Sequence, residues 1–295
     1  MQQTHVLQNN LVRVELHTPG KQYSGSRFDW TGMVTGLEFH GVSMLSTEGT
    51  DPGSFNLLGR GLYNEFGMHH ALGFEDAEPG GWFHKVGIGL LKKDSTIYNF
   101  QDDHEIRQAK FELESEPDSI KITCRSEELN GFAYILEKVY VLETSGLSIH
   151  YSFSNTGEKS FQTSEYVHNF LGFGNEAIGP DYELRFPFEL KESEFGEAVN
   201  SEGKVTIGNR SMSFQNPPVP EFFFDHLNGS RELNAQWELI NYKLGLGIRE
   251  RASFRTDKVN LWGKEHVISP ELFHHISLQS GDTARWTRTY ELFEF

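Results

Sequence analysis

The stretch Ser160–Gly174, SFQTSEYVHNFLGFG, reads as a β-strand that ends on a histidine. The preceding segment Gly146–Ser154 alternates apolar with polar residues, which is the period of two of a half-buried strand. Asn155–Gly157 between them has the composition of a tight turn. Tyr166 and His168 are two residues apart, so the second strand presents both on one face. The chain therefore contains a hairpin that places a histidine beside an aromatic ring.

The rest of the chain follows the same pattern of strands and turns, and helix is expected to be scarce. The best helix candidate is Val219–Leu227, and its pattern is ambiguous. We predict an all-β fold, a large antiparallel sandwich of two curved sheets. Further candidate strands are Leu11–His17, Met33–Phe39, Ala109–Ser115, Ser119–Arg125, Ala133–Glu143, Tyr182–Leu190, Gln236–Tyr242, Gly245–Ala252 and Arg285–Phe295.

No linker or low-complexity tract divides the chain, so residues 1–295 are predicted to form a single domain. Aromatic residues make up 13 % of the chain, which suits wide sheets and a groove lined with rings. The region Thr47–Gly81 is irregular and rich in Gly, Asn and His. A segment of this length in a β-domain is usually functional or crosses a groove.

The net charge is −16, from 26 basic and 42 acidic residues, and no basic run occurs. Nucleic acid and anionic membranes are therefore not expected as partners. The N-terminus resembles no targeting signal and no long apolar segment is present, which favours a cytoplasmic protein. The one cysteine, Cys124, is expected to be a small buried residue. Monomer and homodimer both remain open.

His168 has two interpretations on its residues alone: a core histidine bonded to a backbone carbonyl, or an acid or base at neutral pH. The YVHNF segment resembles the strand of the galactose mutarotase-like (aldose 1-epimerase-like) superfamily that carries a histidine. Val167 stands where the family has Asn or Thr, and Asn169–Phe170 where it has Tyr-Phe-Asn, which indicates a divergent member. The resemblance implies the family's supersandwich fold. It also implies that His168 protonates the ring oxygen of a sugar.

The segment Leu261–Leu292 resembles the C-terminal end of the same family. The resemblance places Glu271, in a predicted Ser-Pro-Glu turn, as the base that takes the proton from the anomeric hydroxyl. A solvated carboxylate in a turn is the plainer interpretation. Its apolar neighbours Pro270 and Leu272 favour a raised pKa and hence a functional role. Trp262 is placed to stack on the apolar face of a sugar.

The resemblance supplies the remaining substrate-binding candidates. Arg60, in GRGLYNEFG, matches an arginine that hydrogen-bonds sugar hydroxyls, although a surface ion pair explains it equally well. Trp82 and His84 share a predicted strand face, and His84 matches the family's second histidine, a role that His69 or His70 fills equally well. Two weaker candidates complete the set, Asn169 and Asp225.

The predicted function is interconversion of the α and β anomers of an unidentified sugar, with Glu271 as base and His168 as acid, and without a cofactor. The two side chains are expected to face each other across one groove, a sugar ring apart. The alternative is a carbohydrate-binding or sensing protein on the same fold. Discrimination for or against phosphorylated or acidic sugars cannot be read from the chain.

A metal-dependent, cupin-like isomerase or dioxygenase is the less favoured alternative, with His69, His70, Glu75 and His84 as ligands. Adjacent histidines on a strand point to opposite faces, whereas inward pairs need a spacing of two. We therefore predict no metal site. A serine hydrolase is disfavoured because no Gly-x-Ser-x-Gly segment occurs.

Overall fold

The computed structural model describes residues 3–51, 57–174, 176–215 and 221–295, and it is dominated by antiparallel strands. A seven-stranded sheet has the order β1–β2–β3–β5–β13–β23, with β4 beside β3. Its strands are β1 (Thr4–Gln8), β2 (Val12–His17), β3 (Met33–Phe39), β4 (Val42–Ser43), β5 (Leu62–Phe66), β13 (Phe161–Asn169) and β23 (His274–Leu278).

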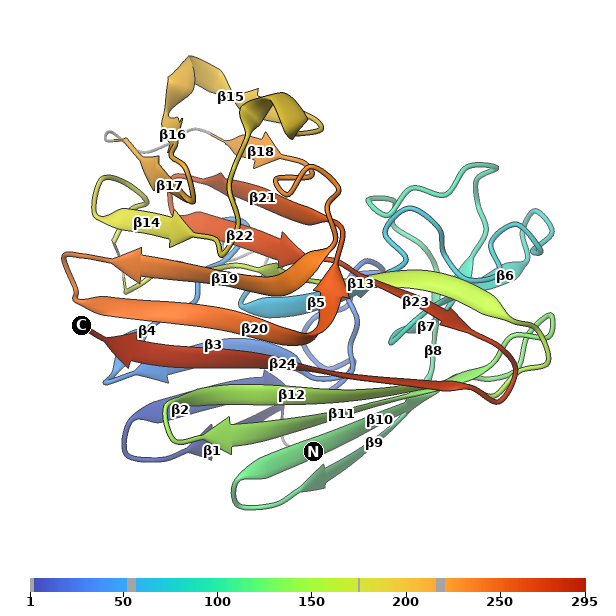
Figure 1. The fold of residues 1–295 in the computed structure, drawn as a ribbon. Coiled ribbons are helices and arrows are strands. Elements are labelled where there is room, and N and C mark those ends of the chain that lie inside the picture. The colour runs from blue at the N-terminus through green and yellow to red at the C-terminus, as the bar shows by residue number, and fades with distance from the viewer. Residues whose placement is uncertain (1–2, 52–56, 175, 216–220) are drawn as a thin grey trace.

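A ten-stranded sheet lies against it, and apolar side chains from both sheets share one core (Figure 1). In spatial order its strands are β16 (Val205–Ile207), β17 (Ser211–Phe214), β14 (Tyr182–Arg185), β19 (Leu233–Asn241), β20 (Leu246–Thr256), β24 (Thr283–Glu294), β12 (Gly146–Asn155), β11 (Tyr134–Glu143), β10 (Ser119–Arg125) and β9 (Lys110–Ser115).

Two smaller sheets complete the fold. One contains β15 (Ala198–Asn200), β18 (Phe222–Phe224), β21 (Val259–Lys264) and β22 (Val267–Leu272). The other contains β6 (Trp82–Lys85), β7 (Gly89–Lys92) and β8 (Ile106–Gln108). The helical segments among the described residues are two short 3₁₀ turns, η2 (Glu192–Glu194) and η3 (Ser201–Gly203).

The predicted all-β sandwich is confirmed, and most predicted strands lie within a residue or a few of the observed ones. Val219–Leu227 is not a helix, because its described part contains β18, whose Phe222 and Phe224 point into the apolar core. Positions 219 and 220 lie outside the described residues. The strand predicted to reach Leu190 ends at Arg185. The region Thr47–Gly81 holds β5 and is otherwise irregular where it is described.

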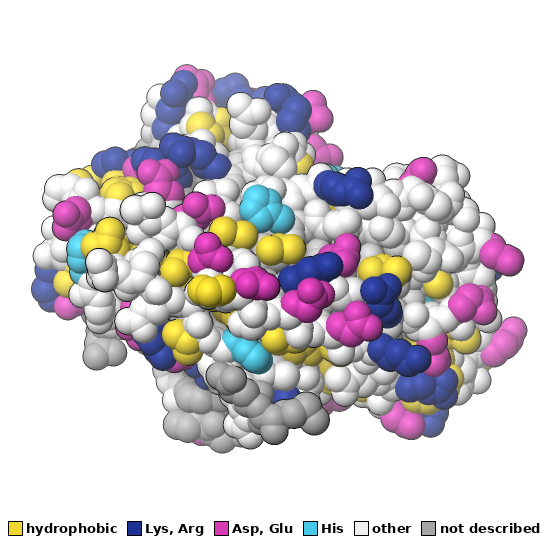
Figure 2. Space-filling model, turned by 90° about the horizontal axis from the view of Figure 1, so that it is seen from below, with side chains coloured by type: hydrophobic (Ala, Val, Ile, Leu, Met, Phe, Trp, Pro, Cys, Tyr) yellow, Lys and Arg dark blue, Asp and Glu magenta, His cyan; other side chains and the backbone are white. Residues whose placement is uncertain are grey.

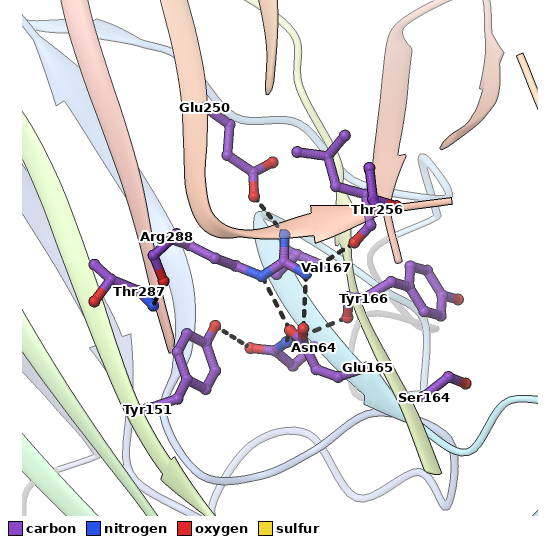
Figure 3. A network of polar contacts seen from close by, with 12 residues as sticks. Asn64, Tyr151, Ser164, Glu165, Tyr166, Val167, Glu250, Thr256, Thr287 and Arg288 are labelled. Carbon is purple, nitrogen blue, oxygen red and sulfur yellow. Dashed lines mark hydrogen bonds and ion pairs between the residues drawn. The ribbon is translucent and has the colours of Figure 1, made fainter. Parts of the chain in front are cut away.

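Arg288 on β24 is fully buried between two carboxylates (Figure 3). Its Nη2 and Nε donate to Glu165 at 2.7 and 3.1 Å, and its Nη1 donates to Glu250. Glu165 belongs to β13 and Glu250 to β20, so the guanidinium joins the two large sheets. Trp237 Nε1 donates to the second oxygen of Glu250 at 2.7 Å.

Asn64 on β5 extends this network across the sandwich. Its amide donates to Glu165, and its side-chain carbonyl accepts from Lys138 Nζ at 2.7 Å and from Tyr151 OH at 2.8 Å. Lys138 also forms an ion pair with Asp29, and both side chains are fully buried. The side chains of Asn64, Glu165 and Arg288 therefore satisfy one another at the centre of the sandwich.

Glu65, next to Asn64 on β5, points to the other side of the sheet and gathers a second set of donors. Its carboxylate accepts from Arg27 Nε at 2.9 Å, Tyr166 OH at 2.7 Å and Lys85 Nζ at 3.3 Å. Counted together, four cations face four carboxylates: Arg27, Lys85, Lys138 and Arg288 against Asp29, Glu65, Glu165 and Glu250.

The outer surface in Figure 2 carries acidic and basic side chains in mixture, and no extended basic field appears on that face. Such a surface offers no track for a polyanion. Among the described residues, no helix has the length and apolar character needed to cross a membrane.

Arg288→Met is expected to lower the free energy of unfolding by about 3–5 kcal/mol, because it leaves two carboxylates buried without their cation. Urea denaturation measures the change. The control is Arg251→Met, whose side chain is half exposed and pairs with Glu291 at 3.0 Å. Loss of this surface pair is expected to cost less than about 1 kcal/mol. If Arg288→Met loses no more free energy of unfolding than Arg251→Met, the buried network contributes little to stability.

Candidate functional site

The outer face of β13 carries the candidate histidine. Strand alternation turns Glu165 and Val167 toward the ten-stranded sheet and Tyr166 and His168 away from it. Across from this face, β22 presents Glu271, and His168 Nε2 lies 3.5 Å from Glu271 Oε1. The fold thus brings together the two residues predicted to be catalytic, although they are 103 positions apart in the chain.

Glu271 is not in a turn, as the Ser-Pro-Glu sequence suggested, but within β22. The turn of this hairpin falls earlier, at Glu265–His266, between β21 and β22. Glu271 therefore pairs across the hairpin with Asn260, and its side chain is held on a strand. Ser269, two residues earlier on the same face, donates to Glu271 Oε1 at 3.2 Å.

Aromatic rings enclose the pair. The imidazole of His168 stacks on Phe170 at 4.0 Å between ring centroids, and the edges of Trp262 and Phe28 contact it at 5.1 and 6.2 Å. Only 5 % of each of His168 and Glu271 is exposed. His168 Nδ1 is buried and has no hydrogen-bond partner among the described residues. The site is therefore lined mainly by aromatic rings, and few of its polar atoms are available to bond a ligand.

Burial sets the protonation of the pair. It raises the pKa of Glu271 to about 8, while the positive charge of Arg27 opposes the rise. Burial, with a smaller contribution from Arg27, holds the pKa of His168 well below its usual value. In the free protein at neutral pH the carboxyl is therefore mostly protonated and the imidazole neutral.

The sequence predicted an ionised Glu271 and a protonated His168. The state that burial favours differs only in that the proton is on Glu271. Both states place one proton on one of two groups whose nearest atoms are 3.5 Å apart. Moving the proton from Glu271 to His168 Nε2 converts the state that burial favours into the state the sequence predicted.

Of the predicted binding residues, Trp262 lies at the pair. Its ring contacts His168, and its Nε1 donates to Glu221 at 3.2 Å. Asp225 belongs to a neighbouring cluster, where it accepts from His226 Nδ1 at 2.6 Å and pairs with Lys258 Nζ at 3.1 Å. The positive charge of Lys258 acts on Glu271. Asp225 thus lies at the border of the site.

The alternation of β13 turns Asn169 away from the site. Its Nδ2 donates to Pro270 O at 2.6 Å, its Oδ1 accepts from Tyr290 OH at 3.1 Å, and its side chain is fully buried. One residue separates it from His168, so the two must point to opposite faces. Its bonds lie within the core of the sandwich.

Strand alternation also separates Trp82 and His84 from His168 and Glu271. Lys85 on β6 reaches Glu65, beside Tyr166, so the alternate residues Trp82 and His84 face the other way. His84 lines a separate cavity of about 320 Å³, and Trp82 lies under the guanidinium of Arg107 at 4.4 Å.

Arg60 lies close enough to His17 for its charge to act on the imidazole. Burial, and then the positive charge of Arg60, lower the pKa of His17 to about 4.

Arg27 is the guanidinium whose charge acts on both His168 and Glu271. It bonds Glu65 and Tyr166 OH and packs against Phe28 and Phe100 at 4.5 and 4.6 Å. The sequence analysis missed Arg27 because its segment, SGSRFDW, carries no periodic pattern.

The histidines of the metal alternative do not form a cluster. His69 and His70 are exposed, whereas His84 is buried in the separate cavity. Within the part of the chain that the structure describes, no three His, Cys, Asp or Glu side chains are grouped as metal ligands.

No family model matches the chain, and no curated protein sequence matches it. Solved structures do. A galactose mutarotase-like protein from Lactobacillus casei matches with a TM-score of 0.60 and 13 % identity, covering 98 % of this chain and 100 % of the other. A galactose mutarotase related enzyme from Lactobacillus acidophilus gives 0.58 and 12 %, covering 98 % and 97 %. An aldose epimerase homologue from C. elegans gives 0.55 and 12 %, covering 99 % and 98 %. The predicted galactose mutarotase-like fold is therefore confirmed, over nearly the whole chain.

Replacing Glu271 is expected to change how stability depends on pH. Between pH 6.5 and 8 native Glu271 keeps a proton that the unfolded chain has released, because burial raises its pKa from 4.5 to about 8. Its contribution therefore makes the free energy of unfolding fall as pH rises, by up to about 1.4 kcal/mol per unit. Glu271→Gln is expected to remove this fall, which urea denaturation across the window measures.

Glu265→Gln, in the exposed turn of the same hairpin, controls for the loss of a charge. If wild type and Glu271→Gln lose stability equally between pH 6.5 and 8, the raised pKa is wrong.

Proposed function

We propose that this chain is a carbohydrate-active enzyme of the aldose 1-epimerase (mutarotase) type, which interconverts the α and β anomers of an aldose at His168 and Glu271. The observation that carries the proposal is the 3.5 Å contact between the two side chains inside a ring-lined site. The fold, found in structures described as mutarotase-like and epimerase homologues, supports the same reaction class.

The close contact suits the chemistry better than the expected separation of a sugar ring. Ring opening removes the proton of the O1 hydroxyl and protonates O5, and both oxygens are bonded to the same carbon, C1. An acid and a base that serve geminal oxygens need not be a sugar ring apart. A distance of 3.5 Å between Nε2 and Oε1 is therefore compatible with one group acting at each oxygen once the substrate has entered.

The proton balance closes over one turnover. With the shared proton on His168, the ionised Glu271 takes the proton from O1, the C1–O5 bond breaks as the C1–O1 double bond forms, and His168 donates to O5. The open aldehyde turns about C1–C2 and closes with the roles reversed. The pair holds one proton at every stage, so the reaction needs no other proton source.

Aromatic contacts supply orientation in this proposal. Trp262 is 5.1 Å from His168 and half-buried, and its accessible part is available to the apolar side of a sugar ring. Arg27, whose charge reaches both His168 and Glu271, disfavours a protonated imidazole and favours an ionised carboxylate. It therefore helps Glu271 to act as the base, while it opposes the protonated His168 that acts as the acid in the same step.

A sugar-binding protein without turnover is the second candidate. The observation in its favour is that burial disfavours the protonated imidazole that catalysis requires, whereas binding requires no protonated histidine. Binding without exchange of anomers would identify this function.

Loss of either member of the pair is expected to slow anomer exchange by about 10²- to 10⁴-fold, the usual contribution of an acid or base. Saturation-transfer NMR on a panel of free aldoses measures the rate for wild type, His168→Ala, Glu271→Ala and the double variant. Because the two groups act as one unit, the double variant is expected to be little slower than either single variant.

The exposed residues His150 and Glu265 provide matched controls as His150→Ala and Glu265→Gln, both expected to keep the wild-type rate. Full activity in both His168→Ala and Glu271→Ala would exclude the assignment. Circular dichroism confirms that each variant is folded.

Trp262→Ala is expected to raise the KM for the exchanged sugar by about tenfold, because a lost stacking contact of about 1.4 kcal/mol weakens binding by that factor. The melting temperature is expected to change less than the KM, since the ring is only half-buried. A large fall in melting temperature with an unchanged KM would identify Trp262 as a structural residue.

A further inference from the structure

The cavity of about 320 Å³ that His84 lines is placed where the chain passes from the three-stranded sheet to the ten-stranded sheet. Strand β8 ends at Gln108 and β9 begins at Lys110, so only Ala109 lies between the two sheets along the chain. All of these residues line the cavity. Its volume is at the lower end of the range for small-molecule sites.

The charges that line this cavity are mainly positive. Arg107, Lys110 and Arg125 line it together with one carboxylate, Glu127. Lys110 and Arg125 are directly opposite each other on β9 and β10, so their side chains share one face. Three cations against one carboxylate leave an excess of positive charge in a chain whose net charge is −16. The folded chain thus creates a local site that favours an anion.

The three cations keep donors free for a ligand. Arg107 donates to Glu127 through Nη1 at 3.0 Å, which uses one of its five N–H groups. Arg125 Nε is 3.6 Å from Glu112, which is longer than a hydrogen bond. Among the residues that the structure describes, Lys110 has no ion-pair partner. An anion in the cavity would therefore find N–H groups that no other acceptor occupies.

Two contacts hold Arg107 at the cavity. Its guanidinium lies over the ring of Trp82 at 4.4 Å from the centroid. Gly89 on the neighbouring strand has a φ of +144°, and a Cβ there would lie 2.2 Å from the carbonyl oxygen of Arg107. The glycine thus lets the backbones of β7 and β8 approach closely. A guanidinium that is already held in place loses little freedom when it binds an anion.

A buried imidazole completes the lining. His84 on β6 is opposite Leu90 on β7, and Leu90 is opposite Arg107 on β8, so the three side chains share one face of the small sheet. His84 is 1 % exposed, and neither ring nitrogen forms a hydrogen bond with a described residue. Burial lowers the pKa of His84 to about 4, against the opposing effect of the Phe132 and Leu129 carbonyls. At neutral pH the ring is therefore uncharged and carries one N–H donor.

We propose that this cavity binds the phosphate or carboxylate group of a small molecule. Arg107, Lys110 and Arg125 are its cations. His84 is its neutral donor, and a ligand oxygen would satisfy a buried group that otherwise lacks a partner. Phosphate and carboxylate oxygens both accept the charge-assisted hydrogen bonds that guanidinium and ammonium groups donate. The cavity is separate from the candidate catalytic pair, so the inference goes beyond the proposed anomer exchange.

Titration calorimetry in low-salt buffer tests the site with inorganic phosphate, glycerol 3-phosphate, glycerate and glycerol. None of these probes is an aldose, so their binding does not depend on the chemistry of the catalytic pair. At least one anion is expected to bind, and uncharged glycerol is not. Binding of the two phosphates alone identifies a phosphate site, and binding of glycerate alone identifies a carboxylate site.

Lys110→Gln and Arg125→Gln are each expected to raise the Kd of the bound anion by about tenfold, because each removes a charged donor. Lys121→Gln is the matched control. Lys121 lies on β10 on the same face as Arg125 and is also exposed, but it pairs with Glu137 at 2.8 Å and does not line the cavity. This variant loses the same charge and is expected to keep the wild-type Kd.

No binding of any anion up to about 10 mM would overturn the inference. So would an affinity that Lys110→Gln and Arg125→Gln leave unchanged, or an equal loss in Lys121→Gln. NMR of the ring nitrogens gives a direct readout of the donor. The ¹⁵N resonances of His84, assigned by comparison with His84→Asn, are expected to shift as the anion is added. Unshifted resonances at saturation would overturn the role of His84.

Discussion

The bond between Arg288 and Glu165 fixes which way the residues of β13 face. Glu165 must point into the sandwich to meet the guanidinium, and both side chains are fully buried. Strand alternation then obliges Tyr166 and His168 to point outward. A slip of one residue would bury the histidine between the sheets and carry Glu165 away from its cation. The register of the functional strand is thus set by a charge pair on the face opposite the site.

The same alternation explains how much of the structure could be predicted from the sequence. Period-two patterns found strands such as Met33–Phe39 and Ser119–Arg125 with their observed bounds, because one face of each is buried. The rule also placed Tyr166 and His168 together. The same alternation puts Asn169 on the opposite face of β13 from His168. On β6 it puts His84 on the opposite face from Lys85, and therefore away from His168 and Glu271.

Other features depend on contacts between distant segments and leave no local signal. Glu271 was expected in a turn because Ser-Pro-Glu has turn composition, yet the turn of its hairpin lies at Glu265–His266. Arg27 reaches the site from a segment without periodicity. The buried cations Lys138 and Arg288 lie in strands whose alternation indicates inward positions. Their partners are distant in the chain: Asn64 is 74 positions from Lys138, and Glu165 is 123 positions from Arg288. Sequence alone gives the face of such a residue and not its partner.

The positions of Glu165, Glu250 and Arg288 in the chain affect the order in which the protein folds during synthesis. Glu165 and Glu250 are synthesised before Arg288, which lies in β24, the last strand described. Until that strand has emerged, burying the two carboxylates would leave them without their cation, at a cost of several kcal/mol. The two large sheets avoid this cost if they stay apart until β24 inserts between β20 and β12. Closure of the two large sheets would then be a late event, completed by the strand that carries the arginine.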